Sequence, residues 1–448
     1  MPFPPDFLWG ASTSSYQIEG AVHEGGRGPS IWDTFSHTPG NVENGDTGDI
    51  ADDHYHRWAD DVALIADLGL QAYHFSIAWP RLFPDGGTTL NEKGVAFYDG
   101  LVDALLERNI TPVVTLFHWD LPQALQDRGG WVNRETVEAY TQYAQTCFER
   151  LGDRVPIWIT QNEPWVVGIL GYLRGLHAPG RTNLQEMLDV SHHLLLSHGR
   201  AVQAYRSSGR TGQIEITLNL FATYPKTDTD ADRAAVIGSD GYTNRRFLDP
   251  LFLGTYPQDT ADIFATAGAD ALAAIRDGDL ATIAAPADFL GVNYYNRRVV
   301  SADTEEFGWK VEPAADPGVN TSDLGWEITP EGLYDLLMRL KRDYPPIPIY
   351  ITENGISLDD RIGPDGSVDD PRRIEYLRAH FEAAQRAMAK GVDLRGFFVW
   401  SLFDNFEWAM GYRPRFGLVY VDYPNGQRRI PKSSARWYAS VIRANGLP

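Results

Sequence analysis

Two stretches that lie far apart in the sequence share one design, and together they restrict the folds open to this chain. Residues 347–355 read IPIYITENG and residues 155–164 read VPIWITQNEP, so each is an apolar run that ends in a single glutamate beside an amide. Such runs are typical of strands buried on both faces, and Gly355 and Pro164 mark the turns that follow them. The side chains of Glu353 and Glu163 can face each other only if both strands belong to one closed parallel sheet.

Other apolar runs predict the rest of that sheet. Eight runs rich in Val, Ile, Phe and Tyr cover residues 7–11, 70–78, 111–119, 155–160, 214–220, 289–295, 347–352 and 396–402. Helical patterns lie between most of them, for example over residues 58–68, 91–108 and 372–390. This alternation predicts the α/β class and a single domain over residues 1–448, a (β/α)8 or TIM barrel with long loops over its C-terminal face. The polar residues 301–323 are predicted to form one such irregular loop.

The unusual polar and aromatic residues all fall near the C-terminal ends of these predicted strands. Barrel enzymes place their sites at this end, whereas scattered structural residues have no reason to share it. The residues are Gln17, His118, Asn162, Glu163, Asn293, Tyr295, Glu353 and Trp400, with Glu407 and Trp408 just beyond the last strand.

A facing pair of glutamates is the equipment for cutting a glycosidic bond with one carboxylic acid and one carboxylate. Carboxyl groups about 5–5.5 Å apart lead to retention of configuration, and a gap of about 6.5–9.5 Å leads to inversion. The sequence does not give this distance.

Several motifs then resemble one known family. T-x-N-E-P around Glu163 and I-T-E-N-G around Glu353 are similar to the two catalytic signatures of glycoside hydrolase family 1, the β-glucosidase family. The resemblance covers almost the whole chain, because five further motifs follow in the expected order. They are FLWGA at residues 7–11, YQIEG at 16–20, FHWDLP at 117–122, DNFEW at 404–408 and RFG at 415–417.

The resemblance implies a role for each candidate residue. Glu353 would be the nucleophile, hydrogen-bonded by Tyr295, and Glu163 the general acid and then the general base. Asn162 would bind the sugar 2-hydroxyl, Gln17 and Glu407 the opposite side of the ring, and Trp400 would form the floor. His118 and Trp408 would add hydrogen bonds, and Trp165 and Trp326 would contact the aglycone. Trp119, Asn293 and Phe416 complete the expected substrate-binding set.

The activity implied is that of a retaining, exo-acting β-glucosidase on terminal non-reducing β-D-glucosyl residues. Expected substrates are cellobiose and aryl or alkyl β-glucosides, with β-galactosides and β-fucosides also accepted. A transglycosylase would use the same residues and stays an alternative. A 6-phospho-β-glucosidase is disfavoured because the carboxylate of Glu407 would repel a sugar phosphate. A non-catalytic sugar-binding protein on the same barrel is disfavoured because both glutamates are present.

One position departs from the family pattern. Residues 73–81 read YHFSIAWPR, and the family ordinarily carries arginine where this chain has His74. A charged His74 would replace the arginine with little change. A neutral, buried His74 would leave Glu353 without a cationic neighbour and raise the pKa of its carboxyl group.

Composition excludes several other classes. A net charge of −21 disfavours nucleic acid and anionic membrane surfaces as partners. Cys147 is the only cysteine, which fits a reducing, cytoplasmic location, and we expect neither a signal peptide nor a membrane span. His54 and His56 lack a convincing third zinc ligand, so no metal and no cofactor is expected. The expected partner is a small-molecule β-glucoside or oligosaccharide, and the oligomeric state is left open.

Overall fold

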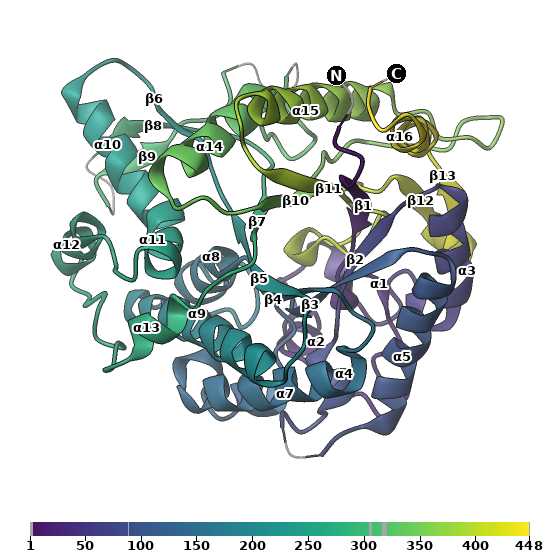
Figure 1. Cartoon of the computed structure of the whole chain (residues 1–448), viewed down its shortest axis with the longest axis horizontal. Coiled ribbons are helices and arrows are strands. Elements are labelled where there is room, and N and C mark those ends of the chain that lie inside the picture. The colour runs from purple at the N-terminus through teal and green to yellow at the C-terminus, as the bar shows by residue number, and fades with distance from the viewer. Residues whose placement is uncertain (1–2, 88, 304–306, 316–319, 448) are drawn as a thin grey trace.

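The computed structural model of the chain describes residues 3–87, 89–303, 307–315 and 320–447. Its centre is a closed barrel of eight parallel strands, in the order β1-β2-β3-β4-β5-β7-β10-β11 and back to β1 (Figure 1). The strands are β1 (Leu8–Ser12), β2 (Ala72–Ser76), β3 (Thr111–Phe117), β4 (Ile157–Asn162), β5 (Gln213–Asn219), β7 (Leu290–Asn293), β10 (Ile349–Asn354) and β11 (Leu394–Trp400). The predicted TIM barrel is therefore confirmed.

A ring of helices surrounds the barrel (Figure 1). The longer ones are α3 (His54–Asp67), α5 (Glu92–Glu107), α7 (Glu135–Leu151), α9 (Leu184–Ser207), α10 (Asp230–Asp240), α12 (Gln258–Thr266), α14 (Pro330–Asp343), α15 (Pro371–Ala389) and α16 (Ser433–Ala444). The shorter ones are α1 (Ser15–Ile18), α2 (Ile31–Ser36), α4 (Trp79–Leu82), α6 (Gln123–Gln126), α8 (Pro164–Val166), α11 (Arg246–Phe252) and α13 (Asp279–Ile283). The Asn91 side chain accepts a hydrogen bond from Lys93 N at the start of α5, as its capping pattern predicts.

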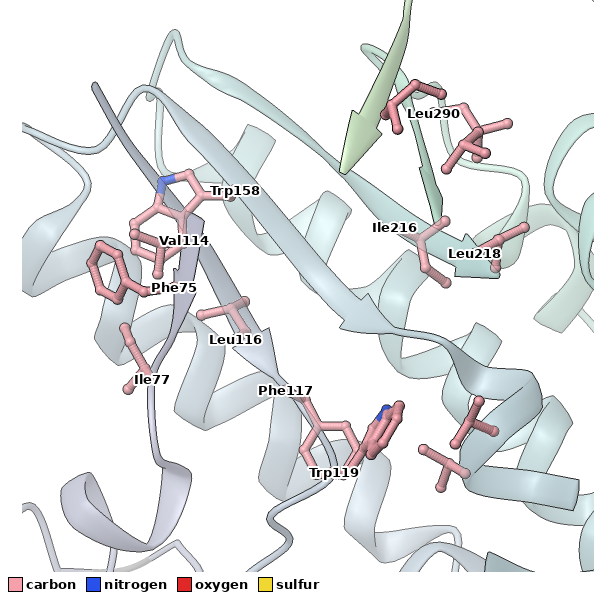
Figure 2. Close-up of a cluster of buried hydrophobic side chains, with 14 of the residues drawn as sticks. Phe75, Ile77, Val114, Leu116, Phe117, Trp119, Trp158, Ile216, Leu218 and Leu290 are labelled. Carbon is pink, nitrogen blue, oxygen red and sulfur yellow. The ribbon is translucent and has the colours of Figure 1, made fainter. Parts of the chain in front are cut away.

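Each barrel strand buries both of its faces, which explains the continuous apolar runs in the sequence. Outward side chains such as Phe75, Val114 and Trp158 lie opposite one another in register and pack under the helices (Figure 2). Inward side chains at the N-terminal end of the barrel form a separate small apolar cluster that includes Val113 and Phe398. This cluster fills the lower part of the barrel, so polar inward side chains gather towards the C-terminal end.

Residues 301–323 differ in part from the predicted irregular loop. β8 (Arg298–Ala302) pairs with β6 (Thr223–Pro225) and with β9 (Trp309–Val311) in a separate three-stranded sheet. The sheet depends on pairing between segments about 75 positions apart, which a local reading of polarity misses. Residues 304–306 and 316–319 of the predicted loop lie outside the described residues.

Two further features complete the fold. β12 (Val419–Asp422) and β13 (Arg428–Pro431) form an antiparallel pair before α16. The two ends of the chain lie side by side, because Phe3 N donates to Asn445 O and the Asn445 side chain donates back to Phe3 O (Figure 1). Within the described part of the chain, no helix combines the length and the apolar character needed to cross a membrane.

Candidate active site

A cavity of about 1140 Å³ opens at the C-terminal ends of the barrel strands. Most of the candidate residues predicted from the sequence line it. They are His118, Trp119, Glu163, Trp165, Asn293, Tyr295, Trp326, Glu353, Trp400, Glu407, Trp408 and Phe416. We call the buried part around Glu163, Glu353 and Glu407 the inner part, and the more exposed part beside β6, β8 and β9 the outer part.

Glu353 is the penultimate residue of β10, and its carboxyl group is held from one side only. The Tyr295 hydroxyl donates to Glu353 Oε2 over 2.5 Å, while Oε1 has no partner among the described residues. Gly355 follows two positions later, where a Cβ atom would lie 1.7 Å from the Trp400 carbonyl oxygen. Only glycine permits this close approach, so the glycine of the ITENG motif brings the end of β10 against the end of β11.

Glu163 directly follows β4 and takes a left-handed backbone conformation with φ 50°. Non-glycine residues adopt this conformation uncommonly, and strained positions of this kind cluster at active sites. It turns the chain out of the strand into Pro164, the first residue of α8, and leaves the side chain facing the cavity. Its Oε1 accepts a hydrogen bond from Asn293 Nδ2 over 2.7 Å.

Asn293, the last residue of β7, connects Glu163 with Thr352, the residue before Glu353. Its Oδ1 accepts a hydrogen bond from Thr352 Oγ1 over 2.7 Å, which fixes the amide so that Nδ2 faces the carboxyl groups. The hydrogen bond from this amide favours the ionised form of Glu163 and so lowers its pKa. The direct bond of Asn293 is to Glu163, whereas Glu353 is bonded by Tyr295 and its Oε1 has no partner among the described residues.

Burial nevertheless dominates the electrostatics of the inner part. It raises the pKa of Glu163 to about 7, and burial together with the charge of Glu163 raises the pKa of Glu353 well above its usual range. The pKa of Glu407 rises to about 8 through burial and the charge of Glu163. No lysine or arginine of the described residues forms an ion pair with any of the three. Three carboxyl groups in one desolvated space cannot all be ionised near neutral pH, so the site retains protons.

Aromatic rings enclose the inner part. His118 stacks at 5.9 Å on Trp400 and at 6.1 Å on Trp408, and Trp119 lies 4.5 Å from Trp408 between ring centroids. Burial lowers the pKa of His118 well below its usual value, so this imidazole is neutral. Oε2 of Glu407 has no partner among the described residues and is free for a ligand.

Two predicted substrate-binding residues do not line the cavity. The Gln17 amide nitrogen donates to Asn405 Oδ1 and to Phe406 O, each over 2.9 Å, and its oxygen accepts from Ser14. Asn162 lies behind the wall, where its Nδ2 contacts His118 Nε2 and its Oδ1 accepts from Asn293. In this structure both amides hold neighbouring residues in place, and their direct contact with a sugar stays a prediction.

His74 lies on β2 below the inner part and has no acidic partner among the described residues. Its ring nitrogens contact Ser12 Oγ at 3.0 Å and Thr115 Oγ1 at 2.6 Å. Burial lowers the pKa of His74 to about 4. Of the two alternatives left open by the sequence, the structure favours the neutral imidazole.

His54 and His56, the two histidines considered above as zinc ligands, contact nearby carboxyl groups. His54 Nδ1 is 2.7 Å from Asp61 Oδ2, and His56 contacts Asp53 and Glu24. Within the described ranges, no group of three or more His, Cys, Asp or Glu side chains is arranged to hold a metal ion.

The outer part contains residues that the sequence analysis missed. Phe221, Tyr242, Arg298, Phe307 and Trp309 line it beside the predicted Trp165. No motif points to them, because they come from connections after β5 and from the three-stranded sheet. The adjacent Arg297-Arg298 pair, placed just before the β-branched residues Val299 and Val300, was the one available signal.

Comparison with known proteins decides the family. The profile described as "Glycosyl hydrolase family 1" matches residues 1–447. The chain belongs to this family. It is therefore a glycoside hydrolase.

Relatives within the family are similar over their full length. The chain is 47% identical to "Beta-glucosidase A" from Acetivibrio thermocellus, with 99% of each chain covered. It is 46% identical to a "Bifunctional beta-D-glucosidase/beta-D-fucosidase" from Bifidobacterium breve, with 99% of this chain and 98% of the relative covered. The solved structure "Beta-glucosidase from Thermotoga maritima in complex with glucoimidazole" superposes with a TM-score of 0.95 at 46% identity, covering 100% of both chains.

Proposed function

We propose that this family 1 enzyme is an exo-acting β-glucosidase that cleaves terminal non-reducing β-D-glucosyl residues with retention of configuration. The observation that carries the proposal is the meeting of Glu163 and Glu353 in one cavity, close enough for the charge of Glu163 to raise the pKa of Glu353. Two facing carboxyl groups are the equipment for cutting a glycosidic bond, and a separation of about 5–5.5 Å leads to retention. Retention is what membership of glycosyl hydrolase family 1 implies.

In the first step, Glu353 attacks the anomeric carbon as a carboxylate and Glu163 gives its proton to the departing oxygen. The C–O bond to the aglycone breaks, a glycosyl ester forms on Glu353, and the alcohol leaves. In the second step, Glu163 takes a proton from water as that water attacks the anomeric carbon. The ester bond breaks, the sugar leaves with its original configuration, and both carboxyl groups return to their starting states.

The hydrogen bonds support this division of roles. The Tyr295 hydroxyl makes a short bond to Glu353 that favours its ionised form, against burial and the charge of Glu163, which together raise the pKa of Glu353. Asn293 engages only Oε1 of Glu163, and Oε2 remains available to carry the proton towards the cavity. Once Glu353 becomes an ester its charge disappears, so Glu163 loses its proton more easily and can act as the base.

The inner part suits an uncharged glycone. Glu407 offers a free carboxyl oxygen, His118 a neutral ring, and Trp400 a flat apolar surface for the C–H face of a pyranose. The carboxyl group of Glu407 disfavours a 6-phosphorylated sugar by charge repulsion. The fucosidase activity in the name of the Bifidobacterium breve relative supports acceptance of β-fucosides. The glucoimidazole complex of the Thermotoga maritima relative supports a small-molecule substrate. A cytoplasmic location is part of the proposal.

The test is hydrolysis of cellobiose and a panel of aryl β-glucosides, β-galactosides and β-fucosides, with NMR of the first sugar released. We expect glucosides and fucosides to be cleaved and β-glucose to appear before mutarotation. Early release of α-glucose would overturn retention, and lack of glucoside cleavage would overturn the substrate assignment. Product analysis at high sugar concentration separates hydrolysis from transglycosylation.

A further inference from the structure

The outer part of the cavity contains one arginine whose charge is not matched. Four basic residues, Lys226, Arg297, Arg298 and Lys310, belong to the three-stranded sheet or flank it, and all line the cavity. Three have acidic partners. Arg297 makes two bonds of 2.8 Å to Glu327, Lys226 lies 2.9 Å from Glu312, and Lys310 lies 3.5 Å from Asp303.

Arg298 is the exception. Its guanidinium forms neither a hydrogen bond nor an ion pair with any residue in the ranges 3–87, 89–303, 307–315 and 320–447. It lies instead over two aromatic rings, 3.8 Å from the centroid of Phe221 and 4.9 Å from that of Trp165. Burial lowers the pKa of Arg298 to about 10, so the group is still charged at neutral pH.

This stacking leaves the donors of the guanidinium available. Aromatic rings cover the flat faces of a stacked guanidinium, whereas its N–H groups point outward in the plane of the group. A half-buried cation without an acidic partner is unfavourable, and a carboxylate that accepts two parallel N–H bonds is its best complement. No side chain among the described residues supplies that carboxylate.

The surroundings of Arg298 suit a flat apolar group. Tyr242 lies 6.4 Å from Trp165, 5.3 Å from Phe307 and 5.8 Å from Trp309, all between ring centroids. Phe307 and Trp309 stack at 5.7 Å. These rings line the same cavity as the catalytic glutamates, so a molecule bound among them lies on the leaving-group side of the reaction.

We propose that the outer part is a subsite for an aromatic aglycone that carries a carboxylate, and that Arg298 binds this carboxylate. The substrates would be β-glucosides of phenolic acids. This inference rests on the proposed glucosidase activity. The net charge of −21 disfavours anions at long range, but at physiological salt the Debye length is about 8 Å, so the local cation dominates.

The test uses two matched pairs of substrates of different reach. The β-glucosides of 4-hydroxybenzoate and 4-hydroxycinnamate are each compared with the corresponding methyl ester, which has nearly the same shape and no charge. In the Arg298→Met variant we expect kcat/KM for at least one acid to fall about tenfold or more, as loss of a hydrogen bond to a charged group implies. The methyl esters should change by less than about twofold, because they make no charge-assisted bond to Arg298. For each substrate, kcat/KM of the variant is divided by kcat/KM of the wild type, and this ratio cancels the intrinsic difference in reactivity between leaving groups.

Two further variants serve as controls for the charge of the sheet and for the planar shape of the guanidinium. Lys226→Met removes one charge from the same sheet and should leave the acid-to-ester ratio unchanged. Arg298→Lys keeps the charge and should lose only part of the preference, because ammonium lacks the planar fork. Activity on the methyl esters shows that each variant is folded.

The outcomes separate the two proposals. An equal loss on acids and esters in Arg298→Met, or an equal effect in Lys226→Met, would overturn the subsite. If the wild-type enzyme cleaves none of the esters, the proposed glucosidase activity fails instead. Calorimetric binding of the four glucosides to Glu163→Gln, with and without Arg298→Met, then still tests the subsite. A preference for the acids that requires Arg298 supports it, and equal binding overturns it.

Discussion

The two parts of the cavity are built on opposite electrostatic principles. The inner part contains three buried glutamates and no arginine or lysine paired with them among the described residues. The outer part contains arginines and lysines, all paired with carboxylates except Arg298 among those of the three-stranded sheet. Protons retained on the glutamates limit the negative charge of the inner part, and acid catalysis needs such a proton. Excess positive charge in the outer part cannot be limited in this way, because arginine keeps its proton.

The difference follows from where the residues come from. Glu163 and Glu353 stand at the ends of barrel strands, where parallel pairing brings them together in a space closed by aromatic rings. The outer residues belong to a sheet added above the barrel, where solvent still reaches Lys226 and Lys310. The barrel thus sets the chemistry, and the added sheet is free to set which leaving group is accepted.

The largest effect should come from the nucleophile. Glu353→Ala should lower kcat on an aryl glucoside by a factor on the order of 10⁵, since loss of a nucleophile typically has such an effect. Azide should restore turnover and yield the α-glycosyl azide, which is identified by NMR. Formation of the β-azide would exchange the roles of the two glutamates. Glu215→Gln is the matched control, because Glu215 is fully buried on β5 but does not line the cavity.

The next effect concerns the retained proton. Glu163→Gln keeps the shape of the side chain but removes its proton, so cleavage of cellobiose should fall about 10²- to 10⁴-fold. Ester formation from 2,4-dinitrophenyl β-glucoside should fall far less, because this leaving group needs little protonation. Pre-steady-state kinetics measures that step separately. Similar losses on both substrates would contradict the general-acid role.

A smaller effect is expected at Glu407. Glu407→Ser removes a carboxyl group that we expect to hydrogen-bond the glycone, so kcat/KM for glucosides should fall about tenfold or more. The same change should raise activity on 6-phosphoglucosides, because it removes charge repulsion. Glu407→Gln, which keeps hydrogen bonding without the charge, separates the two contributions. Unchanged glucoside turnover in Glu407→Ser would remove this residue from the glycone site.

The smallest effect is a shift in pH dependence, which we expect from a substitution that adds a cation to the inner part. Burial keeps His74 neutral, with a pKa of about 4, so residue 74 supplies no cation to the carboxyl group of Glu353. In His74→Arg a fixed positive charge should lower the pKa of Glu353 by about one unit. Glu353 would then stay ionised at lower pH, and the acid limb of kcat/KM on one aryl glucoside should move to lower pH. His74→Gln should leave the limb in place, and an unmoved limb in folded His74→Arg would refute a contact between residue 74 and Glu353.

The sequence by itself determined the barrel and its reactive end. Apolar runs specified all eight strands, with boundaries displaced by at most two residues, so that Asn162 and Glu353 lie within strands rather than after them. The period of hydrophobic residues and the capping by Asn91 are local signals, and parallel pairing then places every C-terminal strand end on one side. This was enough to bring Glu163 and Glu353 into one cavity.

Only the tertiary structure decided which polar groups have a hydrogen-bond or charge partner and which do not. The bonds of Asn293 to Glu163 and Thr352, the engagement of Gln17 by Asn405 and Phe406, and the neutrality of His74 all depend on partners distant in sequence. The three-stranded sheet and the unmatched charge of Arg298 depend likewise on pairing between β6 and β8. Burial and hydrogen bonding are properties of neighbours in space, so a local reading of the sequence identifies a charged residue but not whether its charge is satisfied.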